Sequence, residues 1–225
     1  MATALQQLQR ISKLTTLDGW RWGLAKVETE WWERYLCVDT RADGVLGQRA
    51  VPTESIQYEP LPWFLVRRGV QALNLKEDDV FVDYGAGLGR ALLMAARSEL
   101  KRVIGVELLP SLARIAARNL ATAQHRLKTQ VEVLVTDATT WEVPDDVTVA
   151  YLFNPFVGSV MRAVQEKLCE SLARRPRGLR LLYAHADDQP DLFAPCRWLT
   201  LRRELDGGIY KSLHLKVYST PHAEM

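Results

Sequence analysis

From Asp79 onwards, short apolar runs alternate with longer segments in which apolar residues recur every three or four positions. The short runs are typical of buried strands and the longer segments of amphipathic helices. Because strands and helices alternate, we expect a parallel sheet with helices on both faces, a doubly wound α/β fold. The predicted strands are 80–83, 102–107, 131–136, 147–153 and 179–184, and the helices between them are 90–99, 111–123 and 159–174.

The end of the chain breaks this rhythm. Residues 197–205 and 210–218 both alternate between apolar and polar positions, and Asp206-Gly207-Gly208 lies between them. Asp-Gly and Gly-Gly pairs are typical of hairpin turns. We therefore expect the mostly parallel sheet to close with an antiparallel hairpin.

The first part of the chain has a different character. Residues 1–14 have the spacing of an amphipathic helix, residues 63–73 read as a second helix, and the stretch between is rich in tryptophan. We expect a helical, aromatic extension at 1–62 that covers the substrate side, followed by the sheet domain at 63–225. Most of these tryptophans are expected to anchor the extension, although a pocket for a cation is the alternative.

Composition narrows the class of protein. The chain has 225 residues, 48% hydrophobic and 25% charged, with a formal net charge of +2. This balance is typical of a soluble globular protein and argues against a dedicated nucleic-acid binder. Arginines 174, 175, 177 and 180 form a local basic cluster, which we interpret as a solvated helix end.

Cysteine usage and the absence of targeting signals suggest an intracellular setting. Cys37, Cys169 and Cys196 are odd in number and widely spaced, so they indicate neither a disulfide framework nor a metal site. We expect buried, reduced thiols in a cytoplasmic protein. No apolar run has the form of a signal peptide or a membrane span, and the expected state is a monomer or homodimer without membrane or metal partners.

A glycine-rich segment follows the first predicted strand. It reads Asp83-Tyr84-Gly85-Ala86-Gly87-Leu88-Gly89 and leads directly into a helix. A dinucleotide site has its third glycine one position later, where this chain has Arg90. An acidic residue before the loop is unfavourable beside a pyrophosphate but favourable beside an ammonium group. The pattern therefore favours a cofactor that carries an amine.

Asp-x-Gly-x-Gly-x-Gly resembles motif I of the class I S-adenosylmethionine (SAM) methyltransferases. Five parallel strands followed by an antiparallel hairpin resemble the seven-stranded, Rossmann-like sheet of the same family. The resemblance implies that SAM is the cofactor and that Asp83 holds its methionine ammonium. It also implies that the cofactor lies close to the loop backbone, at Gly85, Ala86, Gly87 and Gly89.

Polar residues follow the next strands at the same predicted edge of the sheet. By the resemblance, Glu107 binds the ribose hydroxyls, and Asp137 with Ala138 faces the adenine. Each residue also has a structural alternative: Asp83 as a helix cap, Glu107 in a surface ion pair and Asp137 as the start of a turn. We favour the joint functional interpretation because consecutive strands present suitable groups at one edge.

Asn154-Pro155-Phe156 follows the fourth strand, where the alternative is simple strand termination. It resembles the Asn-Pro-Pro-Phe/Tyr motif of amino-group methyltransferases, with one proline missing. The resemblance implies that Asn154 and Pro155 accept hydrogen bonds from a target nitrogen and that Phe156 stacks on the substrate or shields the methyl group. Asn154 is also counted among the cofactor contacts.

Further candidates lie outside these motifs. Tyr58 is expected to touch the methionine end of SAM, and Glu59 to accept a proton or pair with a cationic substrate; a rigid loop is the alternative. His185 is a candidate base, although a structural histidine is favoured.

The sequence thus predicts a SAM-dependent methyltransferase that acts on a nucleophile, favoured to be nitrogen, of a small molecule or peptide. Methylation of a nucleic-acid base and SAM binding without catalysis are the alternatives, and a dehydrogenase is a distant fourth.

Overall fold

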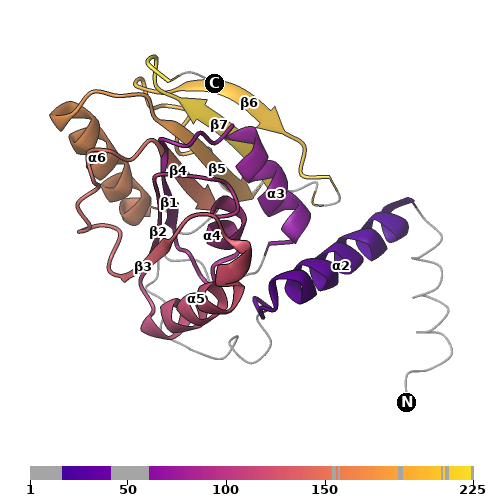
Figure 1. Ribbon diagram of the computed structural model, residues 1–225. Coiled ribbons are helices and arrows are strands. Elements are labelled where there is room, and N and C mark those ends of the chain that lie inside the picture. Colours follow the sequence, from indigo (N-terminus) through magenta and orange to yellow (C-terminus); the bar gives the residue numbers. More distant parts are fainter. Residues whose placement is uncertain are drawn as a thin grey trace, which may run out of the picture.

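The computed structural model describes residues 17–41, 61–153, 156, 158–186, 190–208, 210 and 213–223 (Figure 1). The predicted helix at 1–14 lies outside these residues. So do four candidate site residues, Tyr58, Glu59, Asn154 and Pro155.

A single seven-stranded sheet organises the chain, with strand order β3-β2-β1-β4-β5-β7-β6. The first five strands are parallel, and β7 pairs antiparallel with both β5 and β6. This confirms the predicted mostly parallel sheet with a closing hairpin. The strands are β1 (Val80–Tyr84), β2 (Arg102–Glu107), β3 (Val131–Val135), β4 (Val149–Phe153), β5 (Arg180–Ala186), β6 (Thr200–Leu205) and β7 (Leu213–Ser219).

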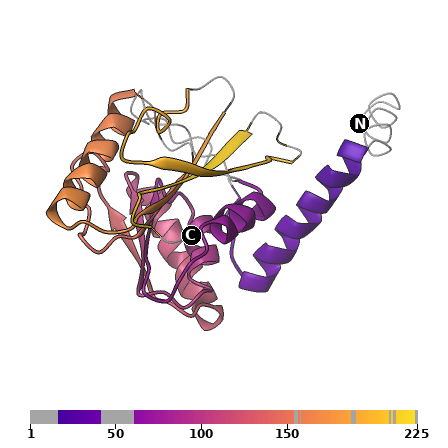
Figure 2. The same ribbon diagram turned by 90° about the horizontal axis from the view of Figure 1, so that it is seen from above.

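Helices cover both faces of the sheet (Figures 1 and 2). One face carries α3, α4 and α5, the other carries α6, and α2 reaches out beside α3. The helices are α2 (Leu17–Leu36), α3 (Trp63–Ala72), α4 (Arg90–Ala95), α5 (Pro110–Ala123), the short 3₁₀ helix η1 (Gln124–Arg126) and α6 (Gly158–Arg174).

The two faces of the sheet support separate hydrophobic clusters. Successive strand residues point to opposite faces. Accordingly, Phe81 and Tyr151 belong to the cluster beneath α3 and α4, whereas Val82 and Tyr183 belong to the cluster beneath α6. Parallel strands buried on both faces are expected to read as continuous apolar runs, as these do.

Two predicted boundaries are wrong. Helix α4 ends at Ala95 rather than residue 99, because the next carbonyl, that of Ala96, accepts from the amides of Lys128 and Thr129 instead of continuing the helix. The final hairpin has a longer connection than a tight turn at 206–208, since β6 ends at Leu205 and β7 begins only at Leu213.

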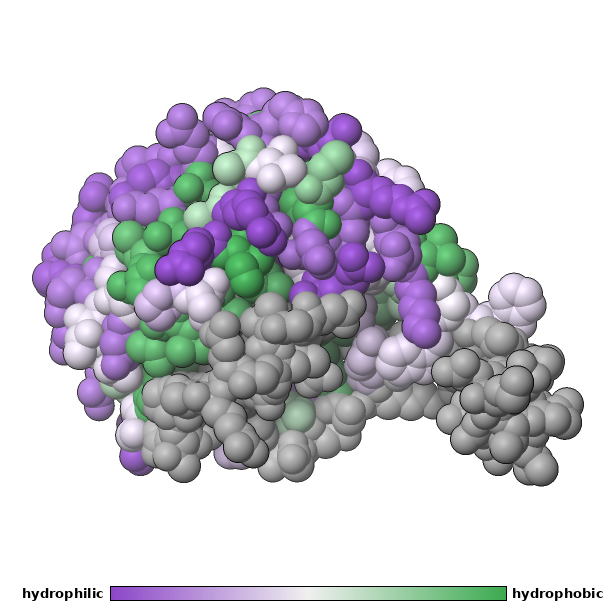
Figure 3. Space-filling view, turned by 90° about the horizontal axis from the view of Figure 1, so that it is seen from below, coloured by the Kyte–Doolittle hydropathy of each residue, from purple (hydrophilic) through white to green (hydrophobic). Residues whose placement is uncertain are grey.

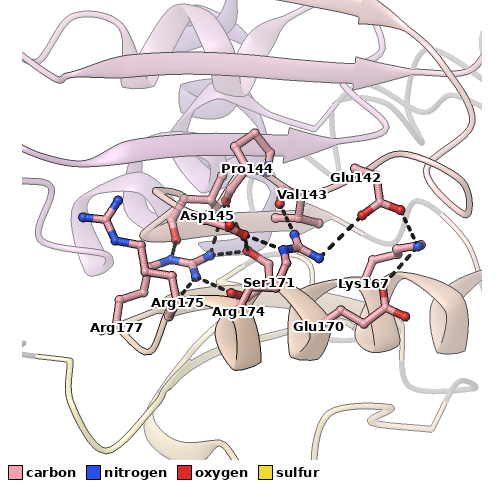
Figure 4. Close-up of polar contacts among 11 residues, drawn as sticks. Glu142, Val143, Pro144, Asp145, Lys167, Glu170, Ser171, Arg174, Arg175 and Arg177 are labelled. Atoms are coloured by element: carbon pink, nitrogen blue, oxygen red, sulfur yellow. Dashed lines mark hydrogen bonds and ion pairs between the residues drawn. The ribbon is translucent and has the colours of Figure 1, made fainter.

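The basic cluster is the solvated helix end that we expected only in part, because Arg174 and Arg175 are exposed but Arg177 and Arg180 are not. Arg180 is buried and forms an ion pair with Asp79. Arg174 bonds Asp145 at 2.9 Å, and Arg177 donates to the hydroxyl of Ser171 at 2.8 Å (Figure 4). These guanidinium groups fasten the end of α6 and the start of β5 to neighbouring loops.

The cysteine prediction is partly wrong, because Cys37 is exposed, while Cys169 and Cys196 are partly buried; all three are free. None of the described helices combines the length and apolar character needed to cross a lipid bilayer. The described residues also bring no three His, Cys, Asp or Glu side chains together as a metal site.

Candidate functional site

The glycine loop lies between β1 and α4, with left-handed φ angles of 73° at Gly85, 55° at Gly87 and 91° at Gly89. Such angles favour glycine over residues with a side chain. The amides of Gly85 and Ala86 donate to the carbonyl of Val106 at 2.8 and 3.1 Å. The loop is therefore fixed against the end of β2.

Glycine is also needed where the loop and its neighbours approach closely. A Cβ at Gly105 in β2 would lie 2.6 Å from Leu92 and 3.1 Å from Ala86. A Cβ at Gly89 would lie 3.4 Å from Ala116 in addition to the unfavourable φ. At Gly105 and Gly89, the backbone thus packs directly against α4 and α5, with no room for a side chain between them.

Glu107 closes this loop from the end of β2. Its Oε2 accepts from the Gly87 amide at 2.8 Å, and its Oε1 accepts from the Leu109 amide at 2.9 Å. Burial raises the pKa of Glu107, although these amides act in the opposite direction. The carboxylate therefore binds the glycine loop and is not in the surface ion pair considered as its alternative. Each of its oxygens retains capacity for a further donor.

Asp83 is the next-to-last residue of β1, where it lies beside Gly105 of β2 and Tyr151 of β4. Its side chain is buried, and no described residue donates a hydrogen bond to its carboxyl group. Burial, together with the nearby charge of Glu107, raises its pKa to about 8. The alternative role as a helix cap does not hold, because Gly89 occupies that position in α4.

Tyr151 was missed by the sequence analysis. Its hydroxyl is buried and has no hydrogen-bond partner among the described residues. It lies close enough to Asp83 for that charge to raise its pKa, after the larger effect of burial. A buried polar group without a partner is uncommon and costs stability. The one feature of the sequence that could have indicated it is a tyrosine, with its polar hydroxyl, in a strand that is otherwise apolar. Asp83 and Tyr151 thus form a polar spot that a cationic, hydrogen-bonding ligand would satisfy.

Asp137 follows β3 and is exposed. Its Oδ1 accepts from the amide and the hydroxyl of Thr139, both at 2.8 Å, so it does begin a turn. Ala138 is buried beside it. The turn fixes Asp137 at the edge of the sheet, and its role toward adenine stays a prediction.

Two other residues lie in the cluster under α6 or next to it. Phe156 is buried in that cluster. His185 is also buried, stacked between Tyr183 and His214 with ring centroids 5.2 and 5.1 Å away, and its Nε2 has no partner within the part of the chain that the structure describes. This placement fits the structural interpretation of His185. Tyr84, from the glycine-rich segment, packs against Trp141 in the same cluster.

A buried network that the sequence analysis missed joins α2 to the glycine loop. Arg90, the first residue of α4, forms an ion pair with Glu33 of α2 at 3.1 Å. Glu33 also accepts from the Trp63 indole at 3.2 Å and from the Thr40 amide at 3.0 Å. Arg90 donates to the Thr40 hydroxyl and to the Leu61 carbonyl.

A second contact fixes the same segment. The side chain of Asn119 in α5 donates to the carbonyls of Asp39 and Leu88 at 3.0 and 3.1 Å. Residues 39–40 and Leu61 are therefore tied to the glycine loop. In Figure 3, hydrophobic side chains gather in a patch on the face shown, and hydrophilic side chains surround much of it.

Comparisons with known proteins agree with this geometry. The family model "Histone methylation protein DOT1" matches residues 45–131, which include the glycine loop and Glu107. A protein-lysine N-methyltransferase from Saccharolobus islandicus (strain REY15A) is 33% identical over 66 residues. That alignment covers 29% of this chain and 41% of the relative, so the chain matches about two fifths of its length.

Solved structures give the fold. A protein of Haemophilus influenzae described as a methylase, HI0767, has a TM-score of 0.55 at 22% identity, covering 71% of this chain and 89% of its own. The Escherichia coli protein yhhF, described as a methyltransferase, has a TM-score of 0.55 at 15% identity, covering 76% and 91%. Together these structures confirm the fold predicted from the sequence, the Rossmann-like fold of the class I methyltransferases.

Proposed function

We propose that this protein is an enzyme that binds SAM and transfers its methyl group to a nitrogen of a peptide or protein side chain. One observation supports SAM as the cofactor. Two buried carboxyl groups, those of Asp83 and Glu107, lie at the ends of adjacent strands, beside a loop whose glycines have left-handed φ angles. Ligands of open α/β sheets bind at such strand ends.

The residues present fit SAM. The carboxyl group of Asp83 has no cation among its described neighbours, and an ammonium group would satisfy it. Glu107 is held by two amides and has acceptor capacity left for the two ribose hydroxyls. Asp137 and Ala138 would face the adenine. The glycines leave the backbone open to close approach along the methionine chain.

The acceptor is inferred from two independent indications. The DOT1 family model and the lysine methyltransferase relative, by their names, concern methylation of proteins. The segment Asn154-Pro155-Phe156 resembles a motif that orients amino groups. We therefore favour an amine of a peptide or protein over a small molecule.

The protein's part in the reaction is positioning. SAM supplies a methyl group already activated by its sulfonium. Asp83 and Glu107 would fix the methionine ammonium and the ribose, on either side of the sulfonium, which sets the direction of the methyl group. Asn154 and the Pro155 carbonyl would accept hydrogen bonds from the acceptor nitrogen and aim its lone pair along the line of displacement, and Phe156 would limit access of water. Glu59 is the proposed acceptor of the amine proton.

The extension at 1–62 is proposed as the cover of the acceptor side, and 63–225 as the SAM-binding domain. Support comes from Thr40 and Leu61, which both accept from Arg90 at the start of α4. The segment between Thr40 and Leu61 contains Tyr58 and Glu59. Both ends of that segment are therefore held next to the glycine loop.

The test combines binding with product analysis. Calorimetry should detect SAM binding by the natural protein and a much weaker signal for Asp83→Ala. Incubation with methyl-labelled SAM and a fractionated extract should place label in protein, and Asn154→Ala should lower turnover far more than SAM affinity. Absence of SAM binding would contradict the cofactor; label in RNA or small molecules alone would contradict the acceptor.

Methylation of a base amino group in a nucleic acid is the second candidate. The Asn154-Pro155-Phe156 segment favours it, because its resemblance includes adenine methyltransferases. The near-neutral charge of the chain weighs against it. The internal bonds of Arg177 and Arg180 also leave fewer arginines of that cluster to contact phosphates.

A further inference from the structure

Helix α2 carries a narrow exposed stripe of large apolar side chains. Trp20, Leu24, Val27 and Trp31 are 69%, 66%, 66% and 52% exposed. They are four, three and four positions apart. At about 100° per residue, all four fall within a sector of about 60° on the helix surface. This is the spacing of a coiled-coil seam.

The opposite side of α2 holds the helix to the domain. Ala25, Trp32, Glu33 and Leu36 are buried there. Figures 1 and 2 show the helix beside α3 with its N-terminal end extending away from the rest of the molecule. The exposed stripe therefore faces outward along a helix that is already fixed at its other side. A contiguous apolar surface of this kind marks an interaction site.

We propose that the stripe pairs with the same stripe of a second copy of this chain, in an antiparallel helix pair. The spacing of four, three and four reads the same in both directions. A two-fold axis between Ala25 and Lys26 would set Trp20 against Trp31 of the partner subunit and Leu24 against Val27 of the partner subunit. Every apolar side chain of the stripe then meets another, as an isologous interface requires.

The helix dipoles support the antiparallel direction. Two helices paired in this way have opposed dipoles, which attract each other, whereas a parallel pair has aligned dipoles.

Other occupants fit the surface less well. Glu28 and Glu30 flank the stripe, and such charges are repelled by nucleic acid and by anionic lipid surfaces. A second copy of this chain presents the same apolar stripe, so no other partner surface is needed. The four side chains span roughly 16 Å of helix, so we expect a weak, concentration-dependent dimer rather than a permanent one.

Sedimentation of the full chain over a wide range of concentrations tests this dimer. The natural protein should dimerise reversibly, and Leu24→Glu/Val27→Glu should raise the dissociation constant at least about tenfold. Leu201→Glu is the matched control, because Leu201 is also exposed but lies on β6. Circular dichroism confirms that each variant is folded. A natural protein that stays monomeric, or a double variant that dimerises equally well, would overturn the proposal. So would a natural monomer that binds vesicles or another protein through this stripe.

Disulfide cross-linking tests whether the two α2 helices of the dimer run antiparallel. Two differently tagged variants, Trp20→Cys and Trp31→Cys, each in a Cys37→Ser background, are mixed and oxidised. The antiparallel pair predicts disulfides mainly between the two variants, since the partners at positions 20 and 31 face each other. Disulfides formed only within each variant would overturn the antiparallel arrangement.

Discussion

Arg90 and Glu33 form a buried ion pair that joins the glycine loop to helix α2, with the guanidinium and carboxylate 3.1 Å apart. The Trp63 ring lies 5.4 Å from the Arg90 guanidinium and donates to Glu33. Removal of one partner leaves the other charge buried without compensation. The pair therefore connects the stability of the extension to the geometry of the loop.

Glu33→Ala should destabilise the fold by about 3–5 kcal/mol, since breaking a buried pair leaves an uncompensated charge. It should also weaken SAM binding, because Arg90 would no longer be held at the start of α4. Chemical denaturation and calorimetry measure the two effects. Glu30→Ala is the matched control on the same helix: Glu30 is 53% exposed and its ion pair with Arg41 is 3.6 Å long, so little change is expected. Equal behaviour of both variants would contradict this coupling.

A second prediction concerns the stability of the protein without cofactor. The pKa of Asp83 is raised from 3.8 to about 8 in the folded state. The folded protein therefore holds a proton that the unfolded chain loses, and the stability from this carboxyl group is complete below pH 3.8 and lost as pH rises through about 8. Asp83→Asn should remove this dependence. The variant should gain about 2 kcal/mol or more near pH 8 relative to the natural protein, about 2–4 °C in Tm per kcal/mol.

The gain should shrink as the pH falls toward 4, which separates it from a general packing effect. Thermal unfolding of both proteins across this range measures it. A constant difference between the two proteins at all pH values would contradict the role of the buried carboxyl group.

The same carboxyl group should link cofactor binding to proton release. Asp83 is mostly protonated at neutral pH, and an ammonium group beside it favours the ionised form. SAM binding near pH 7 should then release about one proton, and affinity should rise toward pH 8. Calorimetry in buffers of different ionisation enthalpy measures the proton count. Asp83→Asn should bind weakly and release none; release that is unchanged in this variant would assign the proton to another group.

Much of this arrangement was predictable because it is local in sequence. Asp83 precedes the glycines and Glu107 ends the next strand, so the order of strands alone brings them to one edge. The pairing of Arg90 with Glu33 was not predictable, since a glutamate and an arginine separated by 57 positions read as two solvated charges. Their burial follows from the packing of α2 against α3, which sequence periodicity does not specify. Tyr151 was hidden in the same way within an apolar strand.

A buried ion pair far from the glycine loop should affect stability alone. Asp79, just before β1, pairs with Arg180 of β5 and accepts from the Lys76 amide at 2.6 Å and the Thr148 hydroxyl at 2.7 Å. Arg180 in turn donates to the Leu73 carbonyl. Asp79→Ala should lower the free energy of unfolding by about 3–5 kcal/mol. SAM affinity per folded molecule should stay the same, and weakened binding below the melting transition would contradict this separation.

Glu107 offers the sharpest test of how the cofactor is held. Glu107→Gln keeps the shape but loses the charge, and hydrogen bonds to charged groups contribute about 1.5–3 kcal/mol, so SAM affinity should fall about tenfold to a hundredfold. Glu142→Gln is the control, because Glu142 is 66% exposed and lies in the surface network of Figure 4. A 2′-deoxyribose analogue of the cofactor should bind the natural protein more weakly, yet lose little further affinity in Glu107→Gln, since both changes remove one contact. Additive losses would show that the ribose is held elsewhere, and would leave Glu107 with the structural task of fixing Gly87.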